Sequence, residues 1–150
     1  MFKIKKVVLL TMICISILCF GCSNLKDALK KPDIVCSAES ILDDISTLDD
    51  KVCFDKYIGK KVNVFGKINS IGYNEEGRLI VVLAYKYGVH HSWGVIAVFD
   101  GLEEERKIKK LQTSDWIKVE GKSLFDIVNP TGIRRVTVYE AKLIEAKSLK

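Results

Sequence analysis

The side chains best suited to bind a ligand lie in two stretches of this chain. Residues 73–93 are rich in aromatic, imidazole and cationic groups, and two arginines follow at residues 134–135. Aromatic rings beside arginine can stack on sugars or on nucleic-acid bases, with each stacked base contributing about 1–3 kcal/mol. The alternative is that alternate aromatic side chains simply fill a core. The candidate ligand-binding residues are Tyr73, Arg78, Tyr85, Tyr87, His90, His91, Trp93, Arg134 and Arg135.

Catalytic and metal-binding patterns are not found. His90 and His91 are adjacent, so on an extended segment their side chains point to opposite faces, and no third ligand stands at a recognised spacing. The paired aspartates at 43–44 and 49–50 are better explained as solvated carboxylates than as calcium ligands. The chain has no glycine-rich phosphate loop, and Ser92 has no nucleophile-elbow context. We therefore expect no enzyme activity, no cofactor and no metal.

Residues 1–22 have the layout of an export signal. Three lysines precede an apolar run of about 14 residues, 7–20. This run is shorter than the roughly 20 apolar residues that a spanning helix needs. Gly21-Cys22 resembles the bacterial lipobox, in which the cysteine receives diacylglycerol and becomes the mature amino terminus. We predict a signal peptide at 1–22 and lipidation at Cys22, with an uncleaved anchor or ordinary secretion as the alternatives.

Export of the chain would change its charge and its location. Removal of the leader takes away three lysines and lowers the formal net charge from +5 to +2. A near-neutral domain lacks the concentrated basic surface on which polyanion binding normally depends. We expect a lipid-anchored protein of the bacterial cell envelope that faces the periplasm or the cell exterior.

Two cysteines remain after the leader and the lipidation site are set aside, Cys36 and Cys53. Cysteines in an oxidising compartment usually pair, so a disulfide between them is expected, with two reduced thiols as the alternative. A bridge that closes a loop of about 18 residues would stabilise the fold by about 3 kcal/mol in the chain-entropy model.

Hydrophobic periodicity predicts one helix followed by five strands. Residues 23–36 are expected to form a flexible tether, and residues 37–150 the folded domain. From Ser37, a suitable N-cap, apolar residues recur at steps of three and four up to Leu48. From residue 60 the period changes to two. The predicted strands are residues 60–71, 78–87, 93–100, 116–124 and 134–144, with a charged helix at 102–111 between the third and the fourth.

The predicted order is that of an OB-fold, a five-stranded Greek-key barrel: three strands, a helix and two further strands within about 85 residues. Gly66, within the first strand, suits a tight bend at a barrel corner. A β-sandwich and an SH3-like barrel are the alternatives. OB-folds bind ligands on strands two and three and in the adjoining loops, where most of the candidate residues fall.

Two stretches and the preceding helix carry a resemblance to a known family. Residues 57–66 (YIGKKVNVFG) follow the pattern Tyr-x-Gly-Lys-x-Val-x-Val-x-Gly, and residues 115–121 (DWIKVEG) stand in for a later Asp-x-Val-x-Val-x-Gly element. Over residues 37–145 the chain resembles the bacterial tRNA_anti-like group of OB-fold proteins, several of which are lipoproteins of unknown role. The resemblance implies an OB-fold and non-enzymatic character.

These observations lead us to expect a membrane-anchored, non-enzymatic OB-fold module that binds a protein or a glycan of the envelope. The near-neutral charge and the export signal argue against nucleic acid as a partner. Two alternatives stay open. One is a structural accessory lipoprotein of an envelope assembly, and the other is a single-stranded nucleic-acid-binding protein that uses Tyr85, Tyr87, Trp93, Arg134 and Arg135.

Overall fold

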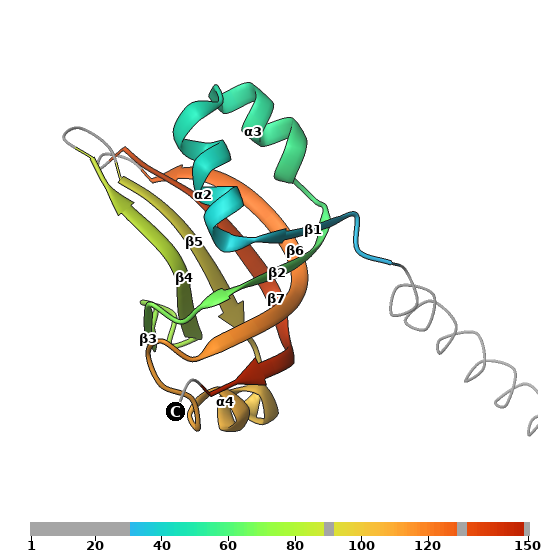
Figure 1. Ribbon diagram of the computed structural model, residues 1–150, viewed down its shortest axis with the longest axis vertical. Coiled ribbons are helices and arrows are strands. Elements are labelled where there is room, and N and C mark those ends of the chain that lie inside the picture. The colour runs from blue at the N-terminus through green and yellow to red at the C-terminus, as the bar shows by residue number, and fades with distance from the viewer. Residues whose placement is uncertain (1–30, 89–91, 129–131, 149–150) are drawn as a thin grey trace, which may run out of the picture. The chain divides into compact units, whose positions relative to one another are not determined.

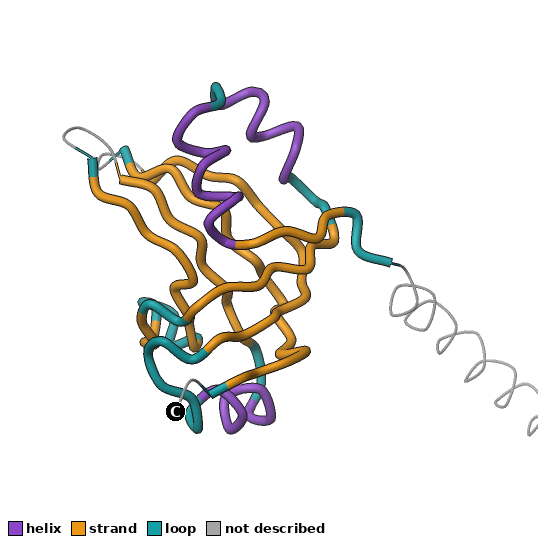
Figure 2. The backbone as a smooth tube through the Cα atoms, viewed as in Figure 1, coloured by secondary structure: helices purple, strands orange, loops and turns teal. Residues whose placement is uncertain are grey.

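The computed structural model describes residues 31–88, 92–128 and 132–148. Residues Pro32–Lys150 form one compact unit. Its described part is mainly β, with strands between two groups of helices (Figures 1 and 2). In chain order the elements are β1 (Ile34–Ser37), α2 (Ala38–Thr47), α3 (Asp50–Tyr57), β2 (Lys61–Lys67), β3 (Ser70–Tyr73), β4 (Leu79–Tyr87), β5 (Ser92–Phe99), α4 (Leu102–Ile108), β6 (Trp116–Val128) and β7 (Ile133–Lys147).

Several sequence predictions fall outside the described residues. These are the leader at 1–22 with Cys22, tether residues 23–30, and the histidines His90 and His91, so the expectations about them stay predictions. Residues 34–36 of the expected tether belong to β1, which pairs in parallel with β2. No helix within the described ranges is long and apolar enough to cross a membrane.

The helix predicted after Ser37 is confirmed. The Ser37 hydroxyl accepts a hydrogen bond from the Ser40 backbone N–H at 3.0 Å, a cap that typically contributes about 1 kcal/mol. Helix α2 buries its apolar stripe of Ala38, Ile41 and Ile45. The short helix α3 was not predicted, because its own apolar periodicity is weak and its start depends on a second cap: Asp49 accepts from the N–H of Val52 at 2.9 Å.

The sheet has the strand order β1-β2-β6-β7-β5-β4-β3. Strands β1 and β2 are parallel, as are β5 and β7, and the other pairs are antiparallel. The expectation of five strands in a barrel is wrong, because the described residues form a sheet of seven strands that no ladder among them closes. Two features account for the difference: β1 forms within the expected tether, and the first expected strand, 60–71, is split, so that β2 pairs with β6 whereas β3 pairs with β4.

Only Ile68 and Asn69 separate β2 from β3. One short segment therefore contacts both ends of the ladder β6-β7-β5-β4, which is the OB-like feature of the arrangement. Ile68 is buried; its N–H donates to the carbonyl of Asp115 and its carbonyl accepts from the N–H of Ser114, both at 2.8 Å. The Asn69 N–H donates to the carbonyl of Val82, also at 2.8 Å. Separate parts of the chain thus satisfy the backbone polar groups of the bend.

The hydrophobic core lies on the concave side of the curved sheet. Helices α2 and α3 lie together at one end of the strands and α4 at the other (Figure 1). Alternation along the strands turns valines and isoleucines inward, and α2 adds its buried stripe. Gly66, expected at a bend, admits the start of α2: a Cβ at this position would lie 3.1 Å from the Cβ of Ala38.

Strands β6 and β7 approach each other closely at Gly121. The register of the two strands shifts between Glu120 and Lys122, and Glu140 on β7 has a φ of 51°. A Cβ on Gly121 would lie 2.7 Å from Cγ1 of Val138, and closer still to the carbonyl oxygen of Tyr139. Since the obstacle includes backbone, a side chain here would force the two strands apart.

We predict that Gly121→Ala lowers the free energy of unfolding by about 1–3 kcal/mol, the usual cost of overpacking. The matched control is Gly72→Ala, because a Cβ on Gly72 meets nothing within 4 Å. Urea denaturation of both variants and the unchanged chain measures the difference. Equal stabilities for the two variants would show that Gly121 is not required for close packing.

Candidate ligand-binding site

Tyr85 and Tyr87 lie together on the outer face of β4. They alternate along the strand, their ring centroids are 4.5 Å apart, and the rings meet edge to face. Tyr87 is 83% exposed, so its ring fills no core. The ring of Tyr85 lies over Gly94 on β5, where a Cβ would be 3.4 Å from it. The small residue opposite Tyr85 therefore leaves room for an aromatic surface.

Arg135 shares this face. It pairs with Gly94 across the parallel strands β5 and β7, and cross-strand partners point to the same side of a sheet. Its guanidinium makes a two-point contact with Asp126, Nε to Oδ1 at 3.0 Å and Nη2 to Oδ2 at 2.8 Å. This contact fixes the plane of the guanidinium, a group that can stack on a planar ligand.

Tyr73 and Arg78 lie at the other end of β4, about 20 Å from Tyr85 at the usual rise of a strand. The hydroxyl of Tyr73 donates to Oε1 of Glu105 on α4 at 2.7 Å. Arg78 pairs with Glu76 and lies 3.8 Å from Asp100. The structure therefore does not bring these two candidates to the tyrosine pair.

Trp93 and Arg134 face inward, beneath the two N-terminal helices. Trp93 packs against the core, and the ammonium of Lys86 lies 5.7 Å from its ring centroid. Arg134 donates from Nη2 to the carbonyl of Leu48 at 2.8 Å and pairs with Asp50 at 2.8 Å. These contacts connect the α2–α3 junction to β7, so both side chains have structural partners.

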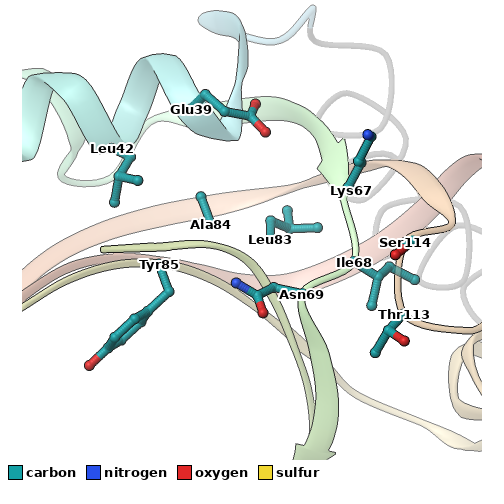
Figure 3. A pocket seen from close by; sticks show the side chains of 10 residues that line it. All are labelled: Glu39, Leu42, Lys67, Ile68, Asn69, Leu83, Ala84, Tyr85, Thr113 and Ser114. Atoms are coloured by element: carbon teal, nitrogen blue, oxygen red, sulfur yellow. The ribbon is translucent and has the colours of Figure 1, made fainter. Parts of the chain in front are cut away.

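A cleft of about 400 Å³ opens beside Tyr85, within the usual size range of small-molecule sites (Figure 3). Helix α2 forms one wall, the bend between β2 and β3 and the 113–114 loop form another, and the edge of β4 forms the third. Strand β3 pairs with β4 only as far as Val82, which leaves the next β4 residues as a free edge. The lining residues are Glu39, Leu42, Lys67, Ile68, Asn69, Leu83, Ala84, Tyr85, Thr113 and Ser114.

The cleft has a mixed chemical lining. The Asn69 amide, which both donates and accepts, lies between Tyr85 and Thr113 in Figure 3. Glu39 is the one acidic side chain of the lining and Lys67 the one cation. Ser114, another lining residue, has a φ of 79°. Such a cleft can take a flat, polar group whose edge carries hydrogen-bond donors and acceptors.

Sequence reasoning missed this cleft because its walls come from four separate segments. The residue types around Ser114 do not predict its positive φ. The one available signal was the break in the 60–71 pattern, where Ile68 and Asn69 interrupt the pairing. A strand that changes partners at one point exposes the edges of both neighbours there.

The expected disulfide is not present. Cys36 and Cys53 both carry free thiols. Burial raises the pKa of each thiol, and this outweighs the opposing effect of Lys56 on Cys36 and of Arg134 on Cys53. Burial and a hydrogen bond to the Asp44 carboxylate likewise raise the pKa of the neighbouring Tyr57 hydroxyl. Neither thiol is therefore activated as a nucleophile.

Slow alkylation of both thiols is the resulting prediction. At pH 8.5 about half of an unperturbed cysteine is thiolate, whereas a raised pKa leaves less thiolate at Cys36 and Cys53. Iodoacetamide should modify both more slowly than a model cysteine at this pH, and faster as the pH rises. Peptide mapping by mass spectrometry measures each rate, with the urea-unfolded chain as the control. A bridged Cys36–Cys53 peptide in the unreduced sample would contradict the prediction.

No group of three or more His, Cys, Asp or Glu side chains in the described ranges is placed to hold a metal ion. No family model matches the sequence, and no curated protein matches it either.

Solved structures that are similar to this chain include the following three. A small single-stranded DNA binding protein from Mycoplasma pneumoniae has 17% identity and a TM-score of 0.38, with 60% of this chain and 93% of that one covered. An asparaginyl-tRNA synthetase from Entamoeba histolytica has 20% identity and a TM-score of 0.40, over 79% of this chain. A putative aspartyl-tRNA synthetase from Leishmania major has 12% identity and a TM-score of 0.41, over 80% of this chain. The match spans only 25% and 22% of the two synthetase chains.

These structures correct one expectation. The near-neutral charge and the export signal led us to expect no nucleic-acid partner, whereas one similar structure is described as a single-stranded DNA binding protein and the other two as aminoacyl-tRNA synthetases.

Proposed function

We propose that this chain is a non-enzymatic OB-like module of the tRNA_anti-like kind that binds a short stretch of single-stranded nucleic acid. The observation that carries the proposal is the pair Tyr85 and Tyr87, which faces solvent directly beside a polar cleft. An 83% exposed tyrosine ring has no packing role. Stacked bases would cover it without needing any particular sequence.

The tyrosine pair provides the stacking surface. A base placed on Tyr87 would be followed by one at Tyr85, since the two rings are already neighbours at 4.5 Å. Arg135, fixed by Asp126, extends this surface toward β7. Alanine substitution of such rings typically costs about 1–3 kcal/mol for each stacked base.

The cleft beside Tyr85 suits a base better than a phosphate. The Glu39 carboxylate would repel a phosphate inside the cleft, yet it can accept a hydrogen bond from the exocyclic amino group of cytosine or adenine. The Asn69 amide can hydrogen-bond either a donor or an acceptor on the edge of a base. Lys67, which has no anionic partner among the described residues, can contact the phosphate that remains outside.

The near-neutral charge fits a short footprint with few phosphate contacts. The predicted leader at 1–22 adds a location to the proposal: a lipid-anchored module would meet its nucleic acid on the outer side of the cytoplasmic membrane. Mass spectrometry of the mature amino terminus tests that part separately.

Tyr87→Ala tests the stacking role. We expect the dissociation constant for a mixed-sequence 12-nucleotide single strand to rise about 5- to 150-fold, the equivalent of one lost stacked base. Fluorescence anisotropy of the labelled strand measures it on the full chain. Tyr73→Ala is the matched control, because Tyr73 is another exposed tyrosine, at 52%, but lies near the far end of β4. Equal affinities for the two variants would refute the stacking role of the tyrosine pair, and no binding by the unchanged chain would refute the proposed function.

A further inference from the structure

A second pair of aromatic rings lies on the outer face of β2 and β6. Lys67 pairs with Trp116, and Phe65 with Lys118, so all four side chains point to the same side. The ring centroids of Phe65 and Trp116 are 5.8 Å apart, and both residues are partly exposed. On the next strand Lys147 pairs with Trp116 and holds its ammonium 5.2 Å from the ring centroid. We call Phe65, Lys67, Trp116, Lys118 and Lys147 the Trp116 platform.

The cations of the platform are only partly neutralised. Lys147 has Glu145 at 3.1 Å. Lys67 and Lys118 have no anionic partner within the part of the chain that the structure describes. Further along the same face the lysines are paired, Lys61 with Glu120 at 3.1 Å and Lys122 with Glu140 at 3.2 Å. Lys67 and Lys118 therefore place positive charge beside Trp116 that no ion pair within the described ranges neutralises.

Lys67 belongs to both surfaces. It lines the cleft beside Tyr85, and it is the direct cross-strand neighbour of Trp116. Neighbouring strands are about 4.8 Å apart, which is less than the distance between successive phosphates of an extended single strand. A chain that leaves the cleft past Lys67 thus reaches Trp116 with its next nucleotide.

We propose that the bound single strand continues from the cleft onto the Trp116 platform. Its bases stack on Trp116 and Phe65, and its phosphates contact Lys67 and Lys118. Rings and ammonium groups alternate on neighbouring strands of the platform, as bases and phosphates alternate along a single strand. Single OB-folds accommodate roughly 4–16 nucleotides. This inference rests on the proposed function and extends its footprint to strands that the sequence analysis did not consider.

Oligonucleotide length separates the two surfaces experimentally. A four-nucleotide strand fits the tyrosine pair and the cleft, whereas a twelve-nucleotide strand reaches the platform. Trp93 and Trp116 are the two tryptophans of the chain, so Trp93→Phe leaves Trp116 as the single fluorescent reporter. The full chain labelled with 5-fluorotryptophan provides a second readout without removing Trp93, with Trp116→Phe used to assign the fluorine resonance.

We expect the twelve-nucleotide strand to quench Trp116 and shift its fluorine resonance, and the four-nucleotide strand to do neither. Lys118→Gln should weaken binding of the longer strand about fivefold and leave the shorter one unchanged. Lys51→Gln on α3, with a side chain 89% exposed, is the control of equal charge change.

Three outcomes decide between the proposals. If the longer strand binds, but Trp116 does not respond and Lys118→Gln has no effect, the platform is overturned while the proposed function stands. If Trp116 responds but Tyr87→Ala changes nothing, the platform is supported and the tyrosine pair is refuted. If neither strand binds the unchanged chain, both proposals fail.

Discussion

The bend at Ile68 and Asn69 is the constraint on which the rest of the structure depends. It divides one segment between two partners, β6 before the bend and β4 after it. Three backbone hydrogen bonds of 2.8 Å hold it, two to the 114–115 loop and one to Val82. Because the Ile68 side chain is buried, the bend is also held by the core. A straight strand could not satisfy both pairings.

Both proposed surfaces follow from this bend. Where β3 stops pairing, β4 is left with a free edge, and the cleft opens between that edge and α2. Where β2 ends, Lys67 lies between the cleft and Trp116. Lys67 and Lys118, which form no ion pair among the described residues, therefore lie near this corner of the sheet. This arrangement explains how a chain with a small net charge can still present a local surface for an anionic strand.

The sequence predicted the parts of the fold that depend on local periodicity. The cap at Ser37, the helix between the third and fourth expected strands and the strand expected at 78–87 are all confirmed. The predicted number of strands was wrong at residues 60–71, because the hydrophobic pattern there does not show that the segment changes its pairing partner from β6 to β4. Helix α3 depends on the Asp49 cap more than on periodicity, and the expected disulfide required a distance that spacing alone cannot provide.

The candidate site was predictable only in part. Tyr85 and Tyr87 share a face by the two-residue period, and the outer position of Phe65 follows from the same rule. Which of the other aromatic and basic residues lie beside them depends on register across several strands. That is why Trp93 and Arg134 were grouped with them although they face inward.

Hydrogen–deuterium exchange of the full chain, with and without a twelve-nucleotide single strand, tests the account most directly. If the cleft at the bend is the centre of binding, the strand will slow exchange in residues 67–69, 84–87 and 113–115. Protection confined to the turn at 74–78 and to α4, or unchanged exchange throughout in the presence of saturating strand, would contradict it.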